Sequence, residues 1–369
     1  MSENNRVRVA VVFGGRSGEH SISCATAAGV LREIDRERFD VIPIGITRDG
    51  QWVSAPDDPA AIEGGLAEVP SAEESVSVTF DQGSGRLAIT SPGQVPRDLD
   101  EVDVVFPLLH GPFGEDGTIQ GLFEMGAVRY VGSGVLSSAV GMDKHYMKVA
   151  LAAAGLPIAP YVIATPRLWR TDPATILDAV AALHFPVFVK PARAGSSLGI
   201  SRVERLEDVP AAIEAAQIHD PRVLIEDGMP GREIECGVLQ GRGDGPPRTA
   251  PLGEIIVDRD QAEFYDYETK YFSPDGAALA CPADLPDEAV AEMQALAARA
   301  FEALCCEGLA RVDFFWDPGH GAVINEVNTM PGFTPISMFP TMWSVAGMPY
   351  PELLTELIEL AMERPLGLR

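Results

Sequence analysis

Short apolar runs alternate with glycine-rich loops through the first part of the chain. Residues 7–13 are apolar and run into the loop GGRSGEHS at 14–21. Residues 21–31 then have the pattern of a helix, and residues 39–46 form a second apolar run. The order strand, loop, helix, strand predicts a doubly wound α/β domain, in which ligands bind at the carboxyl ends of the strands. Residues 102–109 are expected to form another buried strand of this sheet.

Two β-prone apolar runs near the end of the chain predict a hairpin. They flank the turn sequence DPGHG at 317–321, and glycine and proline between two such runs favour a hairpin. We expect Phe315 to pair with Ile324. That register places Arg311 opposite Asn328.

The same register gathers oxygen ligands on one patch of sheet. Side chains alternate between the two faces of a strand, so Asp313 should lie opposite Glu326, with the amide of Asn328 on the same patch. Like charges that face each other across strands are destabilising unless a cation lies between them. Oxygen ligands of this kind suit Mg²⁺. The alternative is a solvated acidic face of the hairpin.

Composition limits the function classes. The chain has 369 residues, which suggests two or three domains, and 46% of them are hydrophobic. A net charge of −26 disfavours nucleic acid or an anionic membrane surface as a partner. An anionic substrate therefore needs a local basic pocket, and lysine is scarce enough to trace. The only lysines are Lys144, Lys148, Lys190 and Lys270.

Cysteine usage and hydropathy predict a cytoplasmic protein. The five cysteines show no CxxC pair and no Cys/His metal spacing, so we expect buried, reduced thiols. The amino terminus lacks the apolar core of a signal peptide, and no apolar run is long enough for a membrane span.

Two loops could bind nucleotide phosphates. The loop at 191–199 follows an apolar strand that ends in Lys190, and its backbone N–H groups could bind phosphate oxygens. The same sequence is also compatible with a plain hairpin turn, and GxxxxGK[ST] is absent. The loop at 14–21 lacks GxGxxG, which disfavours an NAD-dependent oxidoreductase.

Two polar residues near strand ends have both structural and functional interpretations. Glu19 could cap the following helix, or its carboxylate could bind a substrate ammonium group. His110 stands at the end of the strand expected at 102–109, where it is either a structural residue or part of a site.

The ordered motifs resemble those of one family. They are GGRSGEHSIS, LHGPFGEDGTIQG, MDKHYMK, VKPARAGSSLG, FYDYETKYFS, ARVDF and NEVNTMPGFTPIS. The set is similar to that of the D-alanine:D-alanine ligases of the ATP-grasp family, with residues 54–100 the poorest match. The resemblance implies three α/β domains: 1–132 binds the first D-alanine, 133–229 carries the phosphate loop, and 230–369 carries the metal hairpin and a lid loop.

The resemblance also implies residues for the nucleotide and metals. Lys144 and Lys190 would bind the α- and β-phosphates, and Glu226 would accept a hydrogen bond from the adenine amino group. The remaining contacts implied for ATP are Gly195, Ser197 and Gly199 in the phosphate loop, Met229 beside adenine and Glu233 at the ribose. Two Mg²⁺ or Mn²⁺ ions would bind Asp313, Glu326 and Asn328. One departure is visible, because many relatives carry lysine where this chain has Asp227.

The implied reaction is ATP-dependent ligation of two D-alanines through an acyl phosphate, for peptidoglycan precursor synthesis. Glu19 would bind the ammonium of the first D-alanine, with His110 nearby. Arg311 and the N–H of Gly332 would stabilise the tetrahedral oxyanion. The other implied residues are Ser196 and Tyr271, which would order the lid, and Lys270 and Ser337, which would hold the carboxylate of the second D-alanine.

Alternatives remain at this point. They are a D-alanine:D-lactate ligase, another ATP-grasp carboxylate–amine ligase and a nucleotide-binding sensor without catalysis. Relatives that prefer D-lactate carry a basic lid residue, commonly histidine, where this chain has Tyr271. A phenol is neutral near pH 7, which favours a dipeptide product. The resemblance also implies a homodimer.

Overall fold

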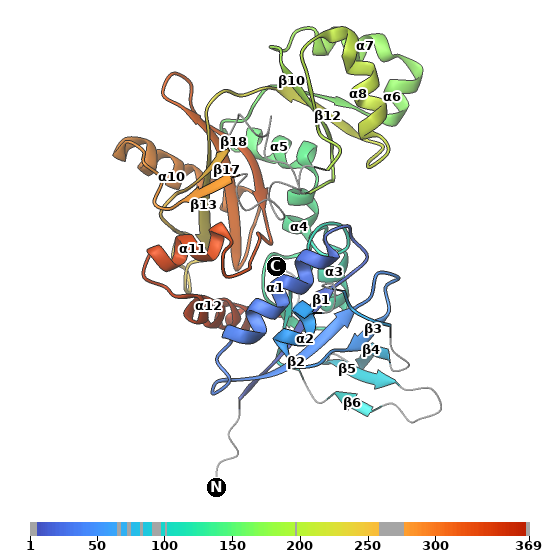
Figure 1. The fold of residues 1–369 in the computed structure, drawn as a ribbon, viewed down its shortest axis with the longest axis vertical. Helices are drawn as coiled ribbons and strands as arrows, with labels where there is room; N and C mark the ends of the chain where they lie inside the picture. The colour runs from blue at the N-terminus through green and yellow to red at the C-terminus, as the bar shows by residue number, and fades with distance from the viewer. Residues whose placement is uncertain are drawn as a thin grey trace.

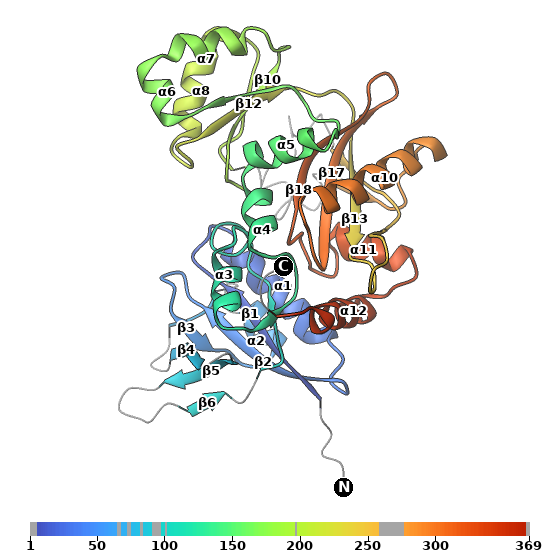
Figure 2. The same ribbon diagram turned by 180° about the vertical axis from the view of Figure 1, so that it is seen from behind.

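The computed structural model describes residues 6–64, 68–71, 75–81, 84–90, 97–99, 102–195, 198–257 and 277–366. Within these ranges the fold is mixed α/β, with four sheets. Figure 1 shows α6, α7 and α8, from the middle of the chain, at the top and the first sheet at the bottom. Figure 2 shows the same arrangement from behind.

The first sheet forms the doubly wound domain that the sequence predicts. Its strand order is β3-β2-β1-β7-β8, and β1 pairs in parallel with both β2 and β7. The strands are β1 (Val7–Gly14), β2 (Phe39–Ile46), β3 (Trp52–Ser54), β7 (Val104–Pro107) and β8 (Arg129–Tyr130). Because successive residues of β1 point to opposite faces, Val9 and Val11 enter one core while Ala10 and Val12 enter another.

Helices cover both faces of this sheet. The core that contains Val9 also holds residues of α1 (His20–Glu33) and of the C-terminal helix α12 (Tyr350–Glu363). On the other face lies α3 (Thr118–Met125). The end of the chain therefore packs on the first sheet, beside α1 in Figure 1.

A small sheet and one short helix extend this part of the chain. The sheet has the order β4-β5-β6, with β4 (Ser75–Asp81), β5 (Ser84–Thr90) and β6 (Arg97–Leu99). The helix is α2 (Pro59–Gly64).

The central sheet has a core of its own. Its order is β11-β10-β12-β9, with β9 (Tyr161–Ala164), β10 (Val187–Pro191), β11 (Ser201–Val203) and β12 (Val223–Asp227). It is covered by α6 (Pro166–Thr171), α7 (Pro173–Val180) and α8 (Val209–Ala216). The short 3₁₀ helix η1 (Leu206–Asp208) leads directly into α8. Every residue of the buried core here lies between Ala164 and Ile225.

Two helices lead from the first sheet into the central one. They are α4 (Val135–Met142) and α5 (Lys144–Ala153). Asp143 caps α5, because its Oδ1 accepts hydrogen bonds from the N–H groups of His145 at 3.1 Å and Tyr146 at 3.2 Å. This cap fixes the start of the helix, with Lys144 in its first turn.

The third sheet carries the predicted hairpin. Its order is β16-β15-β13-β17-β18, with β14 paired to β13. The strands are β13 (Arg232–Leu239), β14 (Arg248–Thr249), β15 (Gly253–Val257), β16 (Ala277–Ala280), β17 (Leu309–Asp317) and β18 (Gly321–Asn328). Its helices are α10 (Asp287–Ala303), which packs on β17 and β18, and α11 (Met338–Val345).

The hairpin register is confirmed at the polar end and wrong at the apolar end. Asp313 lies opposite Glu326, as expected, but Phe315 pairs with Val323 rather than with Ile324. The register shifts after Asp313, so that one extra residue, Asn325, is accommodated as a bulge in β18. Consequently Ile324 faces the buried core and does not share the face of Glu326.

Two further expectations have outcomes here. All five cysteines are free thiols, as predicted, but the expectation that all are buried is wrong. Cys305 is exposed and Cys281 is half-buried. Among the described helices, none has the length and apolar character needed to cross a lipid bilayer.

Candidate active site

The loops that follow β1 and β7 form one wall of the site. Glu19 occupies the N-cap position of α1, but its side chain makes no capping hydrogen bond. The carboxylate points instead into a cavity, where a Cβ placed on Gly111 would stand 2.4 Å from Glu19 Oε2. Gly111 also has a φ of +73°. Glycine is therefore required at 111 if the carboxylate is to keep its place.

His110 is buried beside Glu19 and is held from two sides. Its Nδ1 lies 3.8 Å from Glu115 Oε1, and its Nε2 lies 3.3 Å from Thr26 Oγ1. Burial alone would lower the pKa of His110, but the nearby Glu115 and Glu19 carboxylates outweigh that effect and raise it. Glu115 in turn accepts from the N–H of Gly111 at 2.8 Å, so this wall is one connected polar unit.

The β17–β18 hairpin forms the opposite wall. Arg311 is buried and donates through Nε and Nη2 to both oxygens of Asp313, each at 2.7 Å. Asn328 Nδ2 donates to Asp313 Oδ2 at 2.9 Å and approaches Glu326 Oε1 at 3.5 Å. The two carboxylates and the amide thus converge on one patch, as the pairing of Asp313 with Glu326 predicts.

Protein cations neutralise this acidic patch. Lys144 Nζ lies 3.1 Å from Glu326 Oε2, and Arg311 Nε lies 3.3 Å from Glu235 Oε2. Burial alone would raise the pKa of Glu326, but Lys144 and other nearby cations hold it well below its ordinary value. Glu326 is therefore a carboxylate at neutral pH, which a metal ligand must be.

The donor set fits a hard divalent cation. Asp313 and Glu326 supply carboxylate oxygens, and rotation of the Asn328 amide would supply a third oxygen. Within the described ranges, no three His, Cys, Asp or Glu side chains gather as a possible metal cluster. The amide of Asn328 is the third polar side chain that the structure brings to this patch.

A second charged cluster lies between α5 and the central sheet. Glu226 on β12 is buried, and its Oε2 lies 3.0 Å from Lys148 Nζ, while its Oε1 accepts from Lys190. Burial alone would raise the pKa of Glu226, but the two ammonium groups hold it at about 2. A buried carboxylate is thus kept ionised by two buried lysines.

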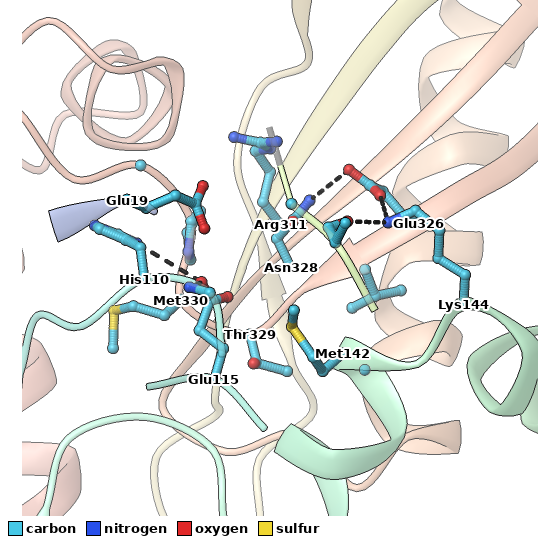
Figure 3. Close-up of a pocket in the computed structure, with 17 residues that line it drawn as sticks. Glu19, His110, Glu115, Met142, Lys144, Arg311, Glu326, Asn328, Thr329 and Met330 are labelled. Carbon is cyan, nitrogen blue, oxygen red and sulfur yellow. Dashed lines mark hydrogen bonds and ion pairs between the residues drawn. The ribbon is translucent and has the colours of Figure 1, made fainter. Parts of the chain in front are cut away.

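One cavity joins the two walls. Figure 3 shows Glu19 and His110 on one side and Arg311, Asn328, Glu326 and Lys144 on the other. The residues predicted from sequence that line this cavity are Glu19, His110, Lys144, Gly195, Arg311, Glu326, Asn328 and Gly332. Segments from all three predicted domains therefore meet at one place.

The other predicted residues lie at varying distance from this cavity. Ser337 adjoins it, because its Oγ would stand 3.3 Å from a Cβ on Gly332. Met229 follows β12 and Glu233 lies on β13, and both are half-buried. Gly199, the last residue of the phosphate loop, has a φ of +72°. Ser196, Ser197, Lys270 and Tyr271 lie outside the described residues.

Comparison with known proteins identifies the family. The model of the D-ala D-ala ligase N-terminus matches residues 8–133, and that of the D-ala D-ala ligase C-terminus matches residues 150–359. The chain belongs to the D-alanine–D-alanine ligase family. A D-alanine–D-alanine ligase of Arthrobacter sp. (strain FB24) is 58% identical over 98% of this chain and 96% of its own length.

Solved structures of the family share the fold. The VanG D-Ala:D-Ser ligase of Enterococcus faecalis superposes with a TM-score of 0.84 at 34% identity, covering 97% of this chain and 100% of that one. The D-alanine–D-alanine ligase of Coxiella burnetii gives 0.79 at 32% identity, with 97% and 94% covered. The predicted ATP-grasp architecture is confirmed.

The contacts in the structure show which side chains the sequence analysis left without a role. Lys144 and Lys148 both fall between the two matched segments, and only Lys144 was predicted as a site residue. Lys148, Glu115 and Glu235 each contact a predicted residue, but none was given a role. For Lys148 a signal existed, since residues four apart share one face of a helix and lysine is rare in this chain.

Proposed function

We propose that this protein is an ATP-dependent ligase that joins two D-alanine molecules, releasing ADP and phosphate, for peptidoglycan precursor synthesis. The observation that carries the proposal is the cavity in which Glu19, Arg311 and the Glu326–Asn328 patch face one another. An ammonium-binding carboxylate, an oxyanion-binding guanidinium and a metal cradle are the parts that the reaction requires. The full-length relatives and both family matches support the same activity.

The first step joins the carboxylate of one D-alanine to the γ-phosphoryl group of ATP. That carboxylate attacks the γ-phosphorus, and ADP leaves with the electron pair of the broken P–O bond. Two anions must meet, so the site has to reduce their repulsion. Lys144 and Lys190 are proposed to bind phosphate oxygens, and Glu19 is proposed to bind the substrate ammonium and thereby to orient the substrate carboxylate.

The second step forms the peptide bond. The amine of the second D-alanine attacks the acyl carbon, and phosphate leaves with its bonding electrons. Negative charge develops on the acyl oxygen, where Arg311 and the N–H of Gly332 are proposed to stabilise it. Arg311 is held in a fixed fork by Asp313, so little reorganisation is needed. Ser337, beside Gly332, is proposed to bind the carboxylate of the second D-alanine together with Lys270.

Two Mg²⁺ or Mn²⁺ ions are proposed at Asp313, Glu326 and Asn328. When bound, they would neutralise phosphate charge and polarise the γ-phosphoryl group. Lys144 pairs with Glu326 in this structure, so its ammonium group would become available to substrate oxygens if metals occupied that carboxylate, while Arg311 would keep its fork with Asp313. We also propose three domains, 1–132, 133–229 and 230–369, and a homodimeric assembly. The proposed location is the cytoplasm, where ATP and reduced thiols are found.

The decisive experiment measures ADP release and identifies the product by mass. Purified protein with ATP, Mg²⁺ and D-alanine should yield D-alanyl-D-alanine and one ADP per dipeptide. Equal D-alanine, D-lactate and D-serine should give mainly the D-alanine dipeptide. The reason applies to D-lactate: an uncharged phenol at position 271 does not repel the ammonium group of the incoming D-alanine. Predominant ester or D-alanyl-D-serine would overturn the acceptor assignment, and ADP release without any ligated product would overturn the activity. Sedimentation velocity would test the dimer.

A further inference from the structure

Lys148 is the buried charged group that the proposed reaction leaves unused. Its side chain is 1% exposed, and it projects from α5 toward the central sheet. Apart from the ion pair with Glu226 at 3.0 Å, no hydrogen-bond partner for Lys148 Nζ is found among the described residues. A buried ammonium group is costly unless it is paired, so this lysine is committed to one carboxylate.

Glu226 has two lysines, and the two differ in what else they can do. Lys190 stands at the end of β10, immediately before the phosphate loop, and is proposed to bind ATP phosphates. When it does so, it gives up part of its interaction with Glu226. Lys148 lies one turn further along α5 than Lys144 and has no such second task. It therefore stays with Glu226 in the nucleotide complex.

The protonation state of Glu226 decides which purine it can accept. An ionised carboxylate only accepts hydrogen bonds, which matches the 6-amino group of adenine. Without a cation beside it, a fully buried carboxylate takes up a proton. The resulting carboxylic acid donates a hydrogen bond, and that matches the 6-oxo group of hypoxanthine or guanine instead.

We propose that Lys148 is a positioning residue for nucleotide recognition: it fixes Glu226 as an ionised acceptor and so sets the preference for ATP over 6-oxopurine triphosphates. The proposal deepens the proposed function and rests on one part of it, the binding of ATP with Glu226 at the adenine amino group; it does not depend on which product is formed. Lys190 neutralises the Glu226 carboxylate only until ATP phosphate binds. Lys148 therefore remains as the cation beside Glu226 once the nucleotide is bound.

The experiment compares ATP with ITP, which differs from ATP at the 6-position. Lys148→Met removes the charge at similar length, Lys148→Arg retains it, and Arg364→Met is the matched control. Arg364 is a buried cation with its own carboxylate partner, Glu307 at 2.8 Å, and lies against the first sheet. Binding of both nucleotides is measured by competition with a fluorescent ATP analogue, and KM and kcat are measured in the ligation assay.

Lys148→Met should raise the Kd and KM for ATP at least about tenfold, change kcat less than about threefold, and lower the ATP:ITP preference at least about tenfold. Lys148→Arg should restore most of that preference, and Arg364→Met should lose stability with the preference intact. If Lys148→Met weakens both nucleotides equally, Lys148 is only a structural partner and the proposal fails.

The double variant Glu226→Gln/Lys148→Met keeps the test decisive if the single variant Lys148→Met does not fold. In Glu226→Gln the carboxylate is already neutral, so adding Lys148→Met should leave the ATP:ITP ratio unchanged. A further fall in that ratio in the double variant would overturn the proposal. Wild-type protein that binds ATP and ITP equally while forming dipeptide also overturns it. Preference for ATP without dipeptide would instead overturn the proposed function and leave this inference standing.

Discussion

Glu326→Gln separates the charge of the metal cradle from its shape. The substitution keeps the side-chain volume but removes the carboxylate that faces Asp313 across the hairpin. Lys144 loses its ion pair at 3.1 Å but keeps its hydrogen bond to the carbonyl of Ala194. Repulsion between the two carboxylates is relieved at the same time. The effect on folding is therefore a small difference between two opposing changes.

The expected loss of stability follows from the exposure of the pair. The side chains of Lys144 and Glu326 are 14% and 28% exposed. Exposed pairs contribute up to about 1 kcal/mol, whereas breaking a fully buried pair costs about 3–5 kcal/mol. This pair lies between those limits, and relief of repulsion offsets part of the loss. We expect the free energy of unfolding to fall by about 1 kcal/mol, which lowers the Tm of a chain of this length by only about 1 °C.

The expected loss of activity is far larger. Removing one preorganised electrostatic group from an active site typically costs about 10²–10³ in kcat. Glu326→Gln weakens the metal cradle and also redirects Lys144, so we expect kcat to fall by at least about 10³, or roughly 4 kcal/mol. Activity and stability should therefore separate clearly in this variant.

The assay is ADP release at a series of Mg²⁺ concentrations, with thermal unfolding followed in parallel. Asp317→Asn is the control, because Asp317 lies in the turn of the same hairpin and accepts from the N–H of Gly319 at 2.8 Å. It should keep turnover within about twofold. Turnover of Glu326→Gln within tenfold of wild type, at an unchanged Mg²⁺ dependence, would refute the metal assignment.

Three other substitutions probe the walls of the cavity. Gly111→Ala places a Cβ 2.4 Å from Glu19 Oε2, so the KM for the first D-alanine should rise at least about tenfold; initial rates with an unchanged KM would contradict this. Glu115→Gln should destabilise the protein more at pH 6 than at pH 9 in urea unfolding. Burial alone would lower the pKa of His110, but Glu115 raises it above 6.5 in the folded protein. The ion pair therefore stabilises the fold fully below pH 6.5, and this contribution is lost as the pH rises through the pKa of His110 in the folded state. An equal loss at both pH values would argue against this ion pair. Tyr350→Phe removes a 2.6 Å hydrogen bond to a main-chain carbonyl, and urea unfolding should show a loss of about 1–3 kcal/mol, whereas an unchanged midpoint would exclude a role for that bond.

The polar end of the hairpin was predictable because local chemistry specifies it. The turn sequence at 317–321 fixes where the chain reverses, and strand alternation then brings Asp313 opposite Glu326. The bulge at Asn325 was not predictable, because one extra residue leaves both apolar runs intact in the sequence. Packing of Ile324 in the core decides its position, and that information is tertiary.

Convergence of distant segments is likewise absent from any local pattern. Spacing gives no reason for Glu19 to meet Gly195, yet a Cβ on Gly195 would stand 3.1 Å from the Glu19 carboxylate. That Glu19 and Gly195 belong to one site was implied by the family resemblance, because the ordered motifs of a family indicate a common fold. Helical spacing could single out Lys148, but not its pairing with Glu226, because Lys148 lies on α5 and Glu226 on β12, far apart in the sequence.

The cores indicate which parts of the site are rigidly connected. Phe333, in the loop after the hairpin, lies in one buried cluster with Phe106 of β7 and Leu354 of α12. The rings of Phe333 and Phe106 are 6.1 Å apart, edge to face. The wall that carries His110 and the loop that carries Gly332 therefore share a single core. Close-packed cores of this kind do not deform continuously.

The central sheet is attached differently. Among the residues that the structure describes, its buried core lies between Ala164 and Ile225 and includes none from the first or third sheet. We therefore expect ATP binding to move this lobe, together with the phosphate loop, against a fixed pair of first and third sheets. Fluorescent labels on α6 and α10 should change distance when an ATP analogue and D-alanine are added, while labels on α1 and α12 should not. A change in the α1–α12 distance with no change in the α6–α10 distance would contradict this expectation, because the movement would then occur within the shared core around Phe333.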